Sequence, residues 1–183
     1  MVCRALRREL LGYSRGLLEE SLLGVPAPPL PRGDALLEEK RGLFVTLRLQ
    51  GALRGCIGRI VAEVALPETL RHCTLEAAFG DRRFSPLTGE ELSMLTIEHS
   101  LLSPPRPLAK AENLRLGVDG VIFSLGGARS VFLPEVALEQ GWDTRALLEA
   151  LARKAGLSPR AWRDSGARFQ VFQTCHYGED DRG

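Results

Sequence analysis

Residues Leu53 to Gly58 read LRGCIG, a string that places two glycines around a cysteine and an isoleucine. Before it, the stretch from Gly42 to Gln50 is rich in β-branched and aromatic residues, which favours a strand. Gly51 then begins a link to LRGCIG. Because glycine permits a sharp turn or the close approach of another molecule, the sequence predicts a glycine-braced turn that presents Cys56 at a working surface.

The side chains of this turn have both functional and structural interpretations. Cys56 could serve as a nucleophile, a redox group or a metal ligand, and the nearby cation of Arg54 would increase its thiolate fraction. Free cysteine is also among the most buried residue types, so Cys56 could equally be a small core residue. Arg54 could grip a carboxylate or phosphate with two hydrogen bonds, or be a solvated charge.

Helical periodicity marks three segments along the chain. After the first of them, four prolines between Pro26 and Pro31 predict an extended connector. Pro67 suits the first turn of the second helix, and Gly80 is expected to end it in a left-handed conformation. Asp143 or Thr144 can cap the third helix, which should end at Gly156. The apolar faces are Leu6, Leu10, Tyr13 and Leu17; Leu70, Cys73 and Ala77; and Leu147, Leu151 and Ala155.

Strand patterns lie between and after these helices. From Leu95 to Leu101, apolar residues and His99 alternate with polar residues, the period expected of a strand with one buried face. A Gly-Gly pair at Gly126 and Gly127 joins two apolar runs and predicts a tight antiparallel hairpin. The expected strands are Ile60–Val64, Leu95–Leu101, Val118–Leu125, Ala128–Leu133 and Phe169–Phe172.

These elements predict an α+β fold with a mainly antiparallel sheet flanked by helices. We expect one domain over residues 1–183, with the helix and proline-rich connector in 1–41 and the motif-bearing body in 42–174. Residues 175–183, which contain Cys175, His176 and the polar end GEDDRG, are expected to fray.

The composition excludes several classes of protein. The chain has 183 residues, 44% of them hydrophobic and 26% charged, which is ordinary for a globular protein. Its 24 Lys and Arg residues nearly balance 23 Asp and Glu residues, so the net charge of +1 disfavours nucleic-acid and membrane partners. No apolar run could cross a bilayer and no signal-peptide pattern is visible, which predicts a cytoplasmic protein. The spacing of the four cysteines disfavours a disulfide framework.

Further polar pairs follow the turn in sequence. Asp81 could hold Arg83 toward an anionic ligand, although a surface salt bridge would explain this pair equally well. His72 and Glu76 lie four residues apart on the second helix and would form either an acid–base pair or a solvated helix face. His99 is expected to be a hydrogen-bonded core histidine or a titratable group near a site. With no HExxH, CxxC or phosphate-binding glycine loop, no metal site is expected and the cofactor is left open.

Taken together, these motifs resemble the AMMECR domain family, also called AmmeMemoRadiSam system protein A. LRGCIG is that family's most recognisable string, and agreement continues through the stretch from Ala77 to Leu87, which holds Asp81, Arg83 and Phe84. In two places the chain departs from the family, with His99 where an aliphatic residue is usual and Glu135 where glutamine is frequent. The other matching stretches are Phe44–Leu47, IEHSLL at Ile97–Leu102, LPEVA at Leu133–Ala137, GWD at Gly141–Asp143 and KAGL at Lys154–Leu157.

The resemblance implies two unequal, closely packed subdomains with a cleft lined by LRGCIG, and it implies no established reaction. It also suggests a pathway shared with a Memo-like protein and a radical SAM protein. One hypothesis is a thiol-dependent enzyme or catalytic accessory in which Cys56 is the reactive group. The anionic small molecule would then be bound by Arg54, Gly55, Gly58, Asp81, Arg83 and Phe84. The alternative is a non-catalytic module that binds a protein or peptide.

Overall fold

The computed structural model describes residues 3–30 and 33–181. The chain forms two compact units, which are described separately. The first unit contains the residues up to Leu102 together with those from Cys175 onward, and the second contains Ser103–Thr174. The second unit is therefore an insertion in the sequence of the first.

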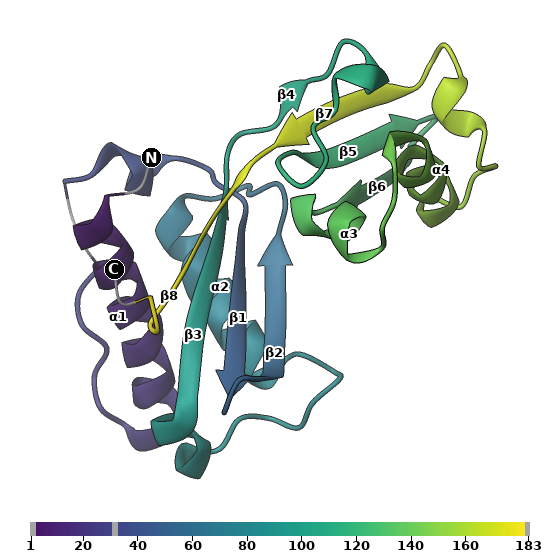
Figure 1. The fold of residues 1–183 in the computed structure, drawn as a ribbon. Helices are drawn as coiled ribbons and strands as arrows, with labels where there is room; N and C mark the ends of the chain where they lie inside the picture. Colours follow the sequence, from purple (N-terminus) through teal and green to yellow (C-terminus); the bar gives the residue numbers. More distant parts are fainter. Residues whose placement is uncertain (1–2, 31–32, 182–183) are drawn as a thin grey trace. The chain divides into compact units, whose positions relative to one another are not determined.

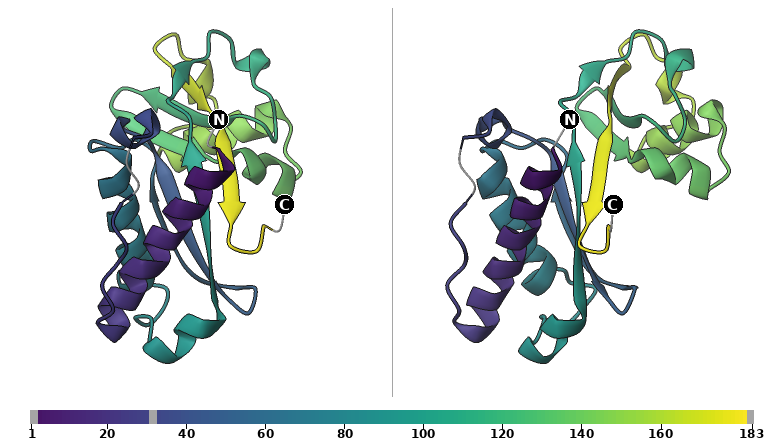
Figure 2. Two further views of the ribbon diagram at one scale, coloured as in Figure 1. Left: turned by 90° about the vertical axis from the view of Figure 1, so that its left-hand side faces the viewer. Right: turned by 60° about the vertical axis from the view of Figure 1, so that its left-hand side comes forward.

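The first unit is built on a four-stranded sheet with the strand order β2-β1-β3-β8. Strand β1 (Leu43–Leu49) pairs antiparallel with both β2 (Ala52–Arg59) and β3 (Leu95–Leu102), and β8 is Thr174–Gly178. Helices α1 (Arg4–Leu23) and α2 (Leu66–Phe79) pack on one side of β1 and β3 (Figures 1 and 2). Short 3-10 helices occur at Ala35–Glu38 and Gly89–Met94.

Between these helices and the sheet lies an apolar core that confirms the periodicities seen in the sequence. All four predicted apolar positions of α1, from Leu6 to Leu17, are buried, as are Leu70, Cys73 and Ala77 of α2. Strand β3 alternates as predicted, and His99 is fully buried. Each fully buried leucine contributes about 1.5–3 kcal/mol relative to an exposed one, so this layer supplies most of the unit's stabilisation.

The prediction of a turn at LRGCIG is wrong, because all six residues lie within strand β2. The turn comes earlier, at Gln50 and Gly51, which have φ values of 51° and 83° and form the two-residue connection of a β-hairpin. The glycines of LRGCIG serve close packing instead. A Cβ on Gly55 would lie 2.1 Å from the carbonyl oxygen of Ala77 in α2, and one on Gly58 would lie 2.3 Å from the ring of Phe44.

Three other predictions also need correction. Residues 60–64 form bends rather than a strand, because they connect the end of β2 to α2. Gly80 has a right-handed conformation (φ −111°), and its missing Cβ leaves room for the Glu76 carboxylate. The chain does not fray at Cys175, since β8 completes the sheet and Tyr177 is only 2% exposed.

The second unit contains another four-stranded sheet, with the order β4-β7-β5-β6. The predicted hairpin is confirmed: β5 (Gly120–Leu125) and β6 (Ala128–Phe132) are joined by two glycines with positive φ. Asp143 caps α4 by accepting a hydrogen bond from the Ala146 N–H. The remaining elements are β4 (Arg106–Pro107), β7 (Arg168–Phe172), α3 (Pro134–Glu139), α4 (Thr144–Lys154) and 3-10 helices at Ala111–Asn113 and Ala161–Arg163.

The two antiparallel sheets with flanking helices confirm the α+β fold class. In the second unit the helix α4 packs against β6, and its Leu147 and Leu151 are buried with Phe123 and Val171 of the sheet. Trp142 contacts Phe132 edge to face and so contributes to the packing of this unit.

Candidate functional site

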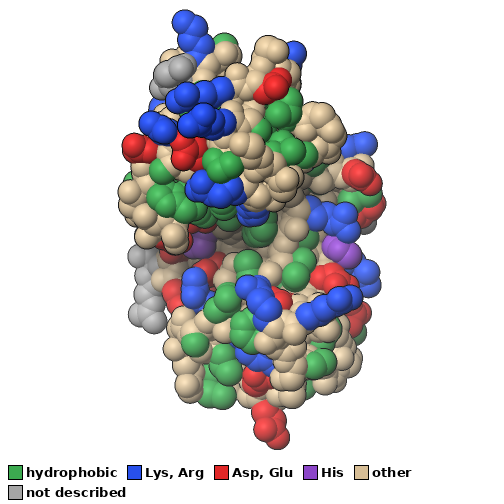
Figure 3. Space-filling view, turned by 90° about the vertical axis from the view of Figure 1, so that its right-hand side faces the viewer, with side chains coloured by type: hydrophobic (Ala, Val, Ile, Leu, Met, Phe, Trp, Pro, Cys, Tyr) green, Lys and Arg blue, Asp and Glu red, His purple; other side chains and the backbone are tan. Residues whose placement is uncertain are grey.

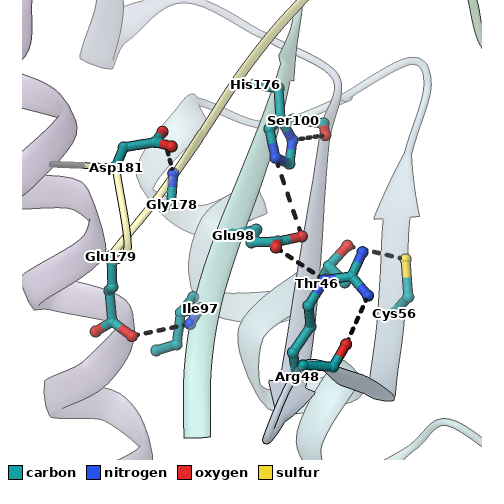
Figure 4. Close-up of polar contacts among 11 residues, drawn as sticks. Thr46, Arg48, Cys56, Ile97, Glu98, Ser100, His176, Gly178, Glu179 and Asp181 are labelled. Carbon is teal, nitrogen blue, oxygen red and sulfur yellow. Dashed lines mark hydrogen bonds and ion pairs between the residues drawn. The ribbon is translucent and has the colours of Figure 1, made fainter. Parts of the chain in front are cut away.

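The first sheet has two unlike faces, since successive side chains of a strand point to opposite sides. The residues of β1 and β3 that face α1 and α2 are buried, whereas the alternate residues are partly exposed. In Figure 4 these alternate side chains lie along the same side of the sheet as Cys56. We call this side the polar face and define it by Thr46, Arg48, Cys56, Glu98, Ser100 and His176.

Cys56 occupies the part of the polar face that lies on β2. Its cross-strand neighbour on β1 is Thr46, whose hydroxyl group donates a hydrogen bond to Sγ over 3.3 Å. The cysteine is partly exposed and free of any disulfide. The hydroxyl group of Thr46 therefore helps to fix the position of the sulfur on the polar face.

The backbone of Cys56 is held from the outer edge of the sheet by Asp81 and Arg83. The Cys56 N–H donates to Oδ2 of Asp81 over 2.9 Å, and Nη2 of Arg83 donates to the Cys56 carbonyl over 3.2 Å. Because β2 is an edge strand, these two side chains replace the hydrogen bonds that a further strand would make. The clamp fixes the position of the cysteine on an otherwise open edge.

The clamp itself is a two-pronged ion pair, as the sequence suggested. Nε and Nη2 of Arg83 donate to the two oxygens of Asp81 over 2.9 and 2.7 Å. Asp81 is buried, yet these hydrogen bonds hold the pKa of its carboxyl group well below the usual range, with the Cys56 N–H adding to the effect. Asp81 is therefore ionised at neutral pH and keeps Arg83 in place.

Arg83 still has donors to offer. Its side chain is 57% exposed, and its guanidinium carbon lies 5.5 Å from the centre of the Phe84 ring. Within residues 3–30 and 33–181, Nη1 makes no hydrogen bond. The structure thus leaves two N–H groups of Arg83 for an anion, and Phe84 supports the guanidinium from one side.

Arg54 plays a different part from the one expected of it. A bulge opposite Leu47 and Arg48 makes it the extra residue of β2 and turns its side chain toward Glu91. Its Nε and Nη2 donate to the Glu91 carboxylate over 2.6 and 3.0 Å, and further bonds reach the carbonyls of Ser85 and Pro86. Four of its donors are thereby used, which assigns Arg54 to holding the 85–91 loop rather than a ligand.

Glu91 responds to this partner. Its hydrogen bonds with Arg54 lower its pKa to about 2, with smaller contributions from the backbone and hydroxyl of Thr88. Thr88 and Glu91 form a capping box at the 3-10 helix Gly89–Met94. This local signal, T-x-x-E, was visible in the sequence, but its link to Arg54 was not.

Gly55 and Gly58 are not ligand-binding positions in this arrangement. As described above, the space beside each of them is filled by the protein's own atoms, in α2 and in Phe44. Gly55 lets β2 pack closely against α2 on the side opposite to Cys56, and Gly58 leaves room for the ring of its cross-strand neighbour Phe44. The structure therefore keeps Cys56, Asp81, Arg83 and Phe84 together as candidate site residues, and it separates the two glycines and Arg54 from that role.

Sequence reasoning missed the rest of the polar face. Arg48 donates through Nε to Glu98 over 2.8 Å, and Ser100 Oγ lies 3.1 Å from Nδ1 of His176. Nε2 of His176 lies 4.0 Å from the same Glu98 carboxylate. Glu98 and Ser100 were visible as the polar members of the alternating strand, whereas His176 was overlooked because its segment was expected to fray.

Two other candidates belong to the core or to the surface. His99 bonds to Ser14 Oγ through Nε2 (3.0 Å) and to the Tyr177 hydroxyl through Nδ1 (3.3 Å). Burial lowers the pKa of His99 to about 3, so the ring is neutral, and it is the core histidine that the strand pattern allowed. His72 is bonded to Arg59 at 3.0 Å, and no bond joins it to Glu76 among the residues that the structure describes.

Within the described part of the chain, no group of three His, Cys, Asp or Glu side chains is arranged to hold a metal ion. Burial raises the pKa of Cys73 to about 11, so this cysteine is a thiol at neutral pH. None of the described helices has the length and apolar character needed to span a bilayer. On the face drawn in Figure 3, acidic side chains lie among the basic ones, in keeping with the near-zero net charge.

Comparisons with known proteins show the family and the fold. Residues 11–177 match the AMMECR1 family model. A protein of Methanothermobacter thermautotrophicus is 39% identical over 180 residues, covering 94% of each chain. Protein MJ0810 of Methanocaldococcus jannaschii is 36% identical and covers 91% of this chain and 87% of its own. The crystal structure of uncharacterized protein PH0010 from Pyrococcus horikoshii superposes with a TM-score of 0.80 at 31% identity, over 98% of this chain and 94% of that one. The chain belongs to the AMMECR1 family.

Proposed function

We propose that this protein acts through the polar face of its first sheet as a thiol-dependent enzyme or catalytic accessory, with Cys56 as the nucleophile. The observation that carries the proposal is the set of hydrogen bonds that holds Cys56 in place. Its sulfur accepts a hydrogen bond from Thr46, while both backbone polar groups are held by Asp81 and Arg83. A partly exposed sulfur on a backbone fixed in this way is suited to reaction with a bound molecule.

The substrate in this proposal is a small anionic molecule. The free donors of Arg83 would bind its carboxylate or phosphate group, since the guanidinium is already oriented by Asp81 and supported by Phe84. The charges of Arg83 and of a Cys56 thiolate also act on one another, which places the two groups within electrostatic reach. An anion held at Arg83 would therefore lie near the nucleophile.

The partners in this proposal are a Memo-like protein and a radical SAM protein, as the family resemblance suggests. The shared pathway would supply the anionic substrate or consume its product. Arg48, Glu98 and His176 extend the polar face beyond Cys56 and offer charged groups that a partner or substrate could contact. The side chain of His176 is 56% exposed.

Thiol alkylation tests the proposal directly. In a Cys3→Ser, Cys175→Ser background, Cys56 and Cys73 are the two cysteines left, and intact-mass spectrometry after iodoacetamide treatment counts the labels. We expect Cys56 to react at neutral pH with a rate that rises with its thiolate fraction, while buried Cys73 stays unlabelled. Replacing Arg83 with Gln should slow the reaction, because it removes a cation that acts on a Cys56 thiolate.

Cys56→Ser supplies the functional arm. Wild-type protein and Cys56→Ser are each co-expressed with the Memo-like and radical SAM proteins, and the anionic metabolites that accumulate are compared. An altered metabolite profile supports the thiol-dependent role. If Cys56 proves as unreactive as Cys73 and the variant leaves the profile unchanged, the catalytic proposal fails. If the wild-type protein and Cys56→Ser then both retain a partner in stoichiometric amount in a pull-down, the result would favour the non-catalytic binding module.

A further inference from the structure

A second site lies near β8, at the edge of the first sheet opposite to β2. An open pocket of about 670 Å³ is formed between the first three turns of α1 and the chain at Tyr177–Asp181. Pockets that bind small organic molecules commonly have volumes of roughly 300–1,000 Å³, so this one is large enough for a ligand. Its floor includes Leu11 and Tyr177, which are 7% and 2% exposed.

Gly12 is the most informative residue of this pocket. It lies in the interior of α1, where glycine weakens a helix relative to alanine. A Cβ at Gly12 would have no protein atom within 4 Å. Gly16, one turn later, is different, because its Cβ would lie 2.1 Å from Pro28. The protein's own packing therefore explains the glycine at position 16, whereas the glycine at position 12 widens the pocket.

The wall formed by α1 is basic. Arg4, Arg7 and Arg8 all line the pocket, and the guanidinium carbon of Arg7 lies 5.5 Å from the centre of the Tyr177 ring. The side chains of Arg4 and Arg8 are exposed and make no ion pair or hydrogen bond with other described residues. These two arginines therefore have donors available to a ligand.

Two acidic residues, Glu179 and Asp181, also line the pocket, and neither forms an ion pair with Arg4 or Arg8. Glu179 accepts hydrogen bonds from Nε of Arg15 (3.0 Å) and from the backbone of Ile97 (2.8 Å). Asp181 accepts one from the Gly178 N–H at 2.8 Å. The pocket thus combines an apolar floor with a cationic wall, a combination suited to an anion that has an apolar body.

We propose that this pocket binds a small organic anion whose carboxylate, sulfonate or phosphate group is held by Arg4 and Arg8 while its apolar body covers Leu11, Gly12 and Tyr177. The site is independent of Cys56 and of the function proposed for the polar face. Because Tyr177 and Glu179 belong to β8 and the residues after it, a ligand here would also join α1 to the last strand of the sheet.

The probe is 8-anilinonaphthalene-1-sulfonate, whose fluorescence rises in an apolar site. Its neutral counterpart, N-phenyl-1-naphthylamine, has the same rings without the sulfonate. We expect saturable binding of the sulfonate to the folded protein. The Arg4→Gln, Arg8→Gln variant should weaken sulfonate binding by roughly tenfold, as expected for loss of charged hydrogen bonds, with little change for the neutral probe. Arg153→Gln, Arg160→Gln is the matched charge control.

Gly12→Leu separates binding from folding. The added side chain fills the pocket but strengthens the helix, so the variant should be at least as heat-stable as the wild type and should bind both probes weakly. Ala5→Leu, on an exposed position of the same helix, is its control and should leave binding unchanged. Sulfonate binding that survives Gly12→Leu, equal weakening of both probes by the arginine variant, or an absence of saturable binding would overturn the proposal.

Discussion

The two faces of the first sheet come from the same strands, yet they are built on different principles. On the helix-covered face, four buried polar side chains bond to one another: Thr74, Ser14, His99 and Tyr177 are linked in that order between α2, α1, β3 and β8. On the polar face, Cys56, Arg48 and Glu98 keep partial exposure. Alternation along a strand thus separates residues that stabilise the fold from residues available for chemistry.

The largest effect on stability is expected from adding a methyl group to the helix-covered face at Gly55. In Gly55→Ala the new Cβ would lie 2.1 Å from the Ala77 carbonyl oxygen, so α2 must move away from β2. We expect the free energy of unfolding to fall by about 3 kcal/mol, at the upper end for overpacking. Urea unfolding measures it, with Gly12→Ala as a control that should gain up to about 1 kcal/mol. Equal stability of Gly55→Ala and wild type would contradict the packing described.

The covered face should also respond to acid through His99. Its pKa of about 3 in the folded protein lies below the ordinary value near 6.5, because the ring is buried, so the unfolded chain binds a proton that the folded one refuses. Stability from this residue is complete above pH 6.5 and is lost as the pH falls toward 3. The loss is about 1.4 kcal/mol per pH unit in that window.

Unfolding curves at pH 6.5, 5.5 and 4.5 measure this effect, and comparing variants cancels the contribution of Glu91, whose carboxyl group begins to bind a proton in the unfolded chain near pH 4.5. His99→Leu should lose about 2 kcal/mol less than the wild type between pH 6.5 and 4.5. His72→Gln is the control and should keep the wild-type slope, because that histidine is on the surface. An identical slope for His99→Leu and wild type would show that His99 is not buried as a neutral ring.

Arg54 belongs to neither face of the sheet, because the bulge in β2 turns its side chain toward Glu91. Its side chain is 11% exposed and forms a two-pronged pair with Glu91. A double-mutant cycle with Arg54→Gln and Glu91→Gln should give a coupling free energy of about 1–2 kcal/mol. The exposed pair of Arg145 and Glu149 on α4 is the comparison, and its coupling should be smaller. Equal coupling in the two pairs would return Arg54 to the candidate ligand-binding residues.

The smallest expected effect lies on the polar face, at the hydroxyl group beside Cys56. Thr46→Val keeps the shape of the side chain and removes the hydrogen bond to Cys56 Sγ. The rate of Cys56 alkylation at neutral pH should fall roughly two- to tenfold, in line with the loss of one hydrogen bond. Thr96→Val, at a partly exposed position of β3, should leave the rate unchanged. A faster reaction in Thr46→Val would mean that the hydroxyl shields the sulfur rather than activates it.

Local patterns in the sequence were enough for most of the fold. The strand at Leu95, the hairpin at Gly126 and the helix capped by Asp143 each depend on periodicity or turn chemistry within a few residues. The burial of His99 followed from the same alternation. These features could be predicted because their causes lie close together along the chain.

The turn predicted at LRGCIG was wrong because the contacts that decide its conformation lie far away in the sequence. Two glycines in six residues favour a turn locally, and nothing nearby reveals that Gly55 must fit against Ala77, twenty-two positions later. The partner of Arg54 lies 37 residues away. His176 joins Ser100 only because β8 returns to the first sheet after the whole second unit. The contacts that join Cys56, Asp81 and Arg83 could be expected from their short stretches of sequence, while the geometry around them depended on long-range pairings.

That return of β8 has a consequence for biosynthesis. A ribosome releases residues 103–174 before the segment that supplies the fourth strand of the first sheet. Until then, β3 has an unpaired edge, His99 lacks Tyr177, and Arg15 lacks Glu179, its partner 164 positions further along. The first unit therefore cannot complete its sheet until β8 has left the ribosome, whereas the inserted unit can fold from contiguous sequence. Nascent chains interrupted before Cys175 would expose the unpaired edge of β3 to pairing with other chains.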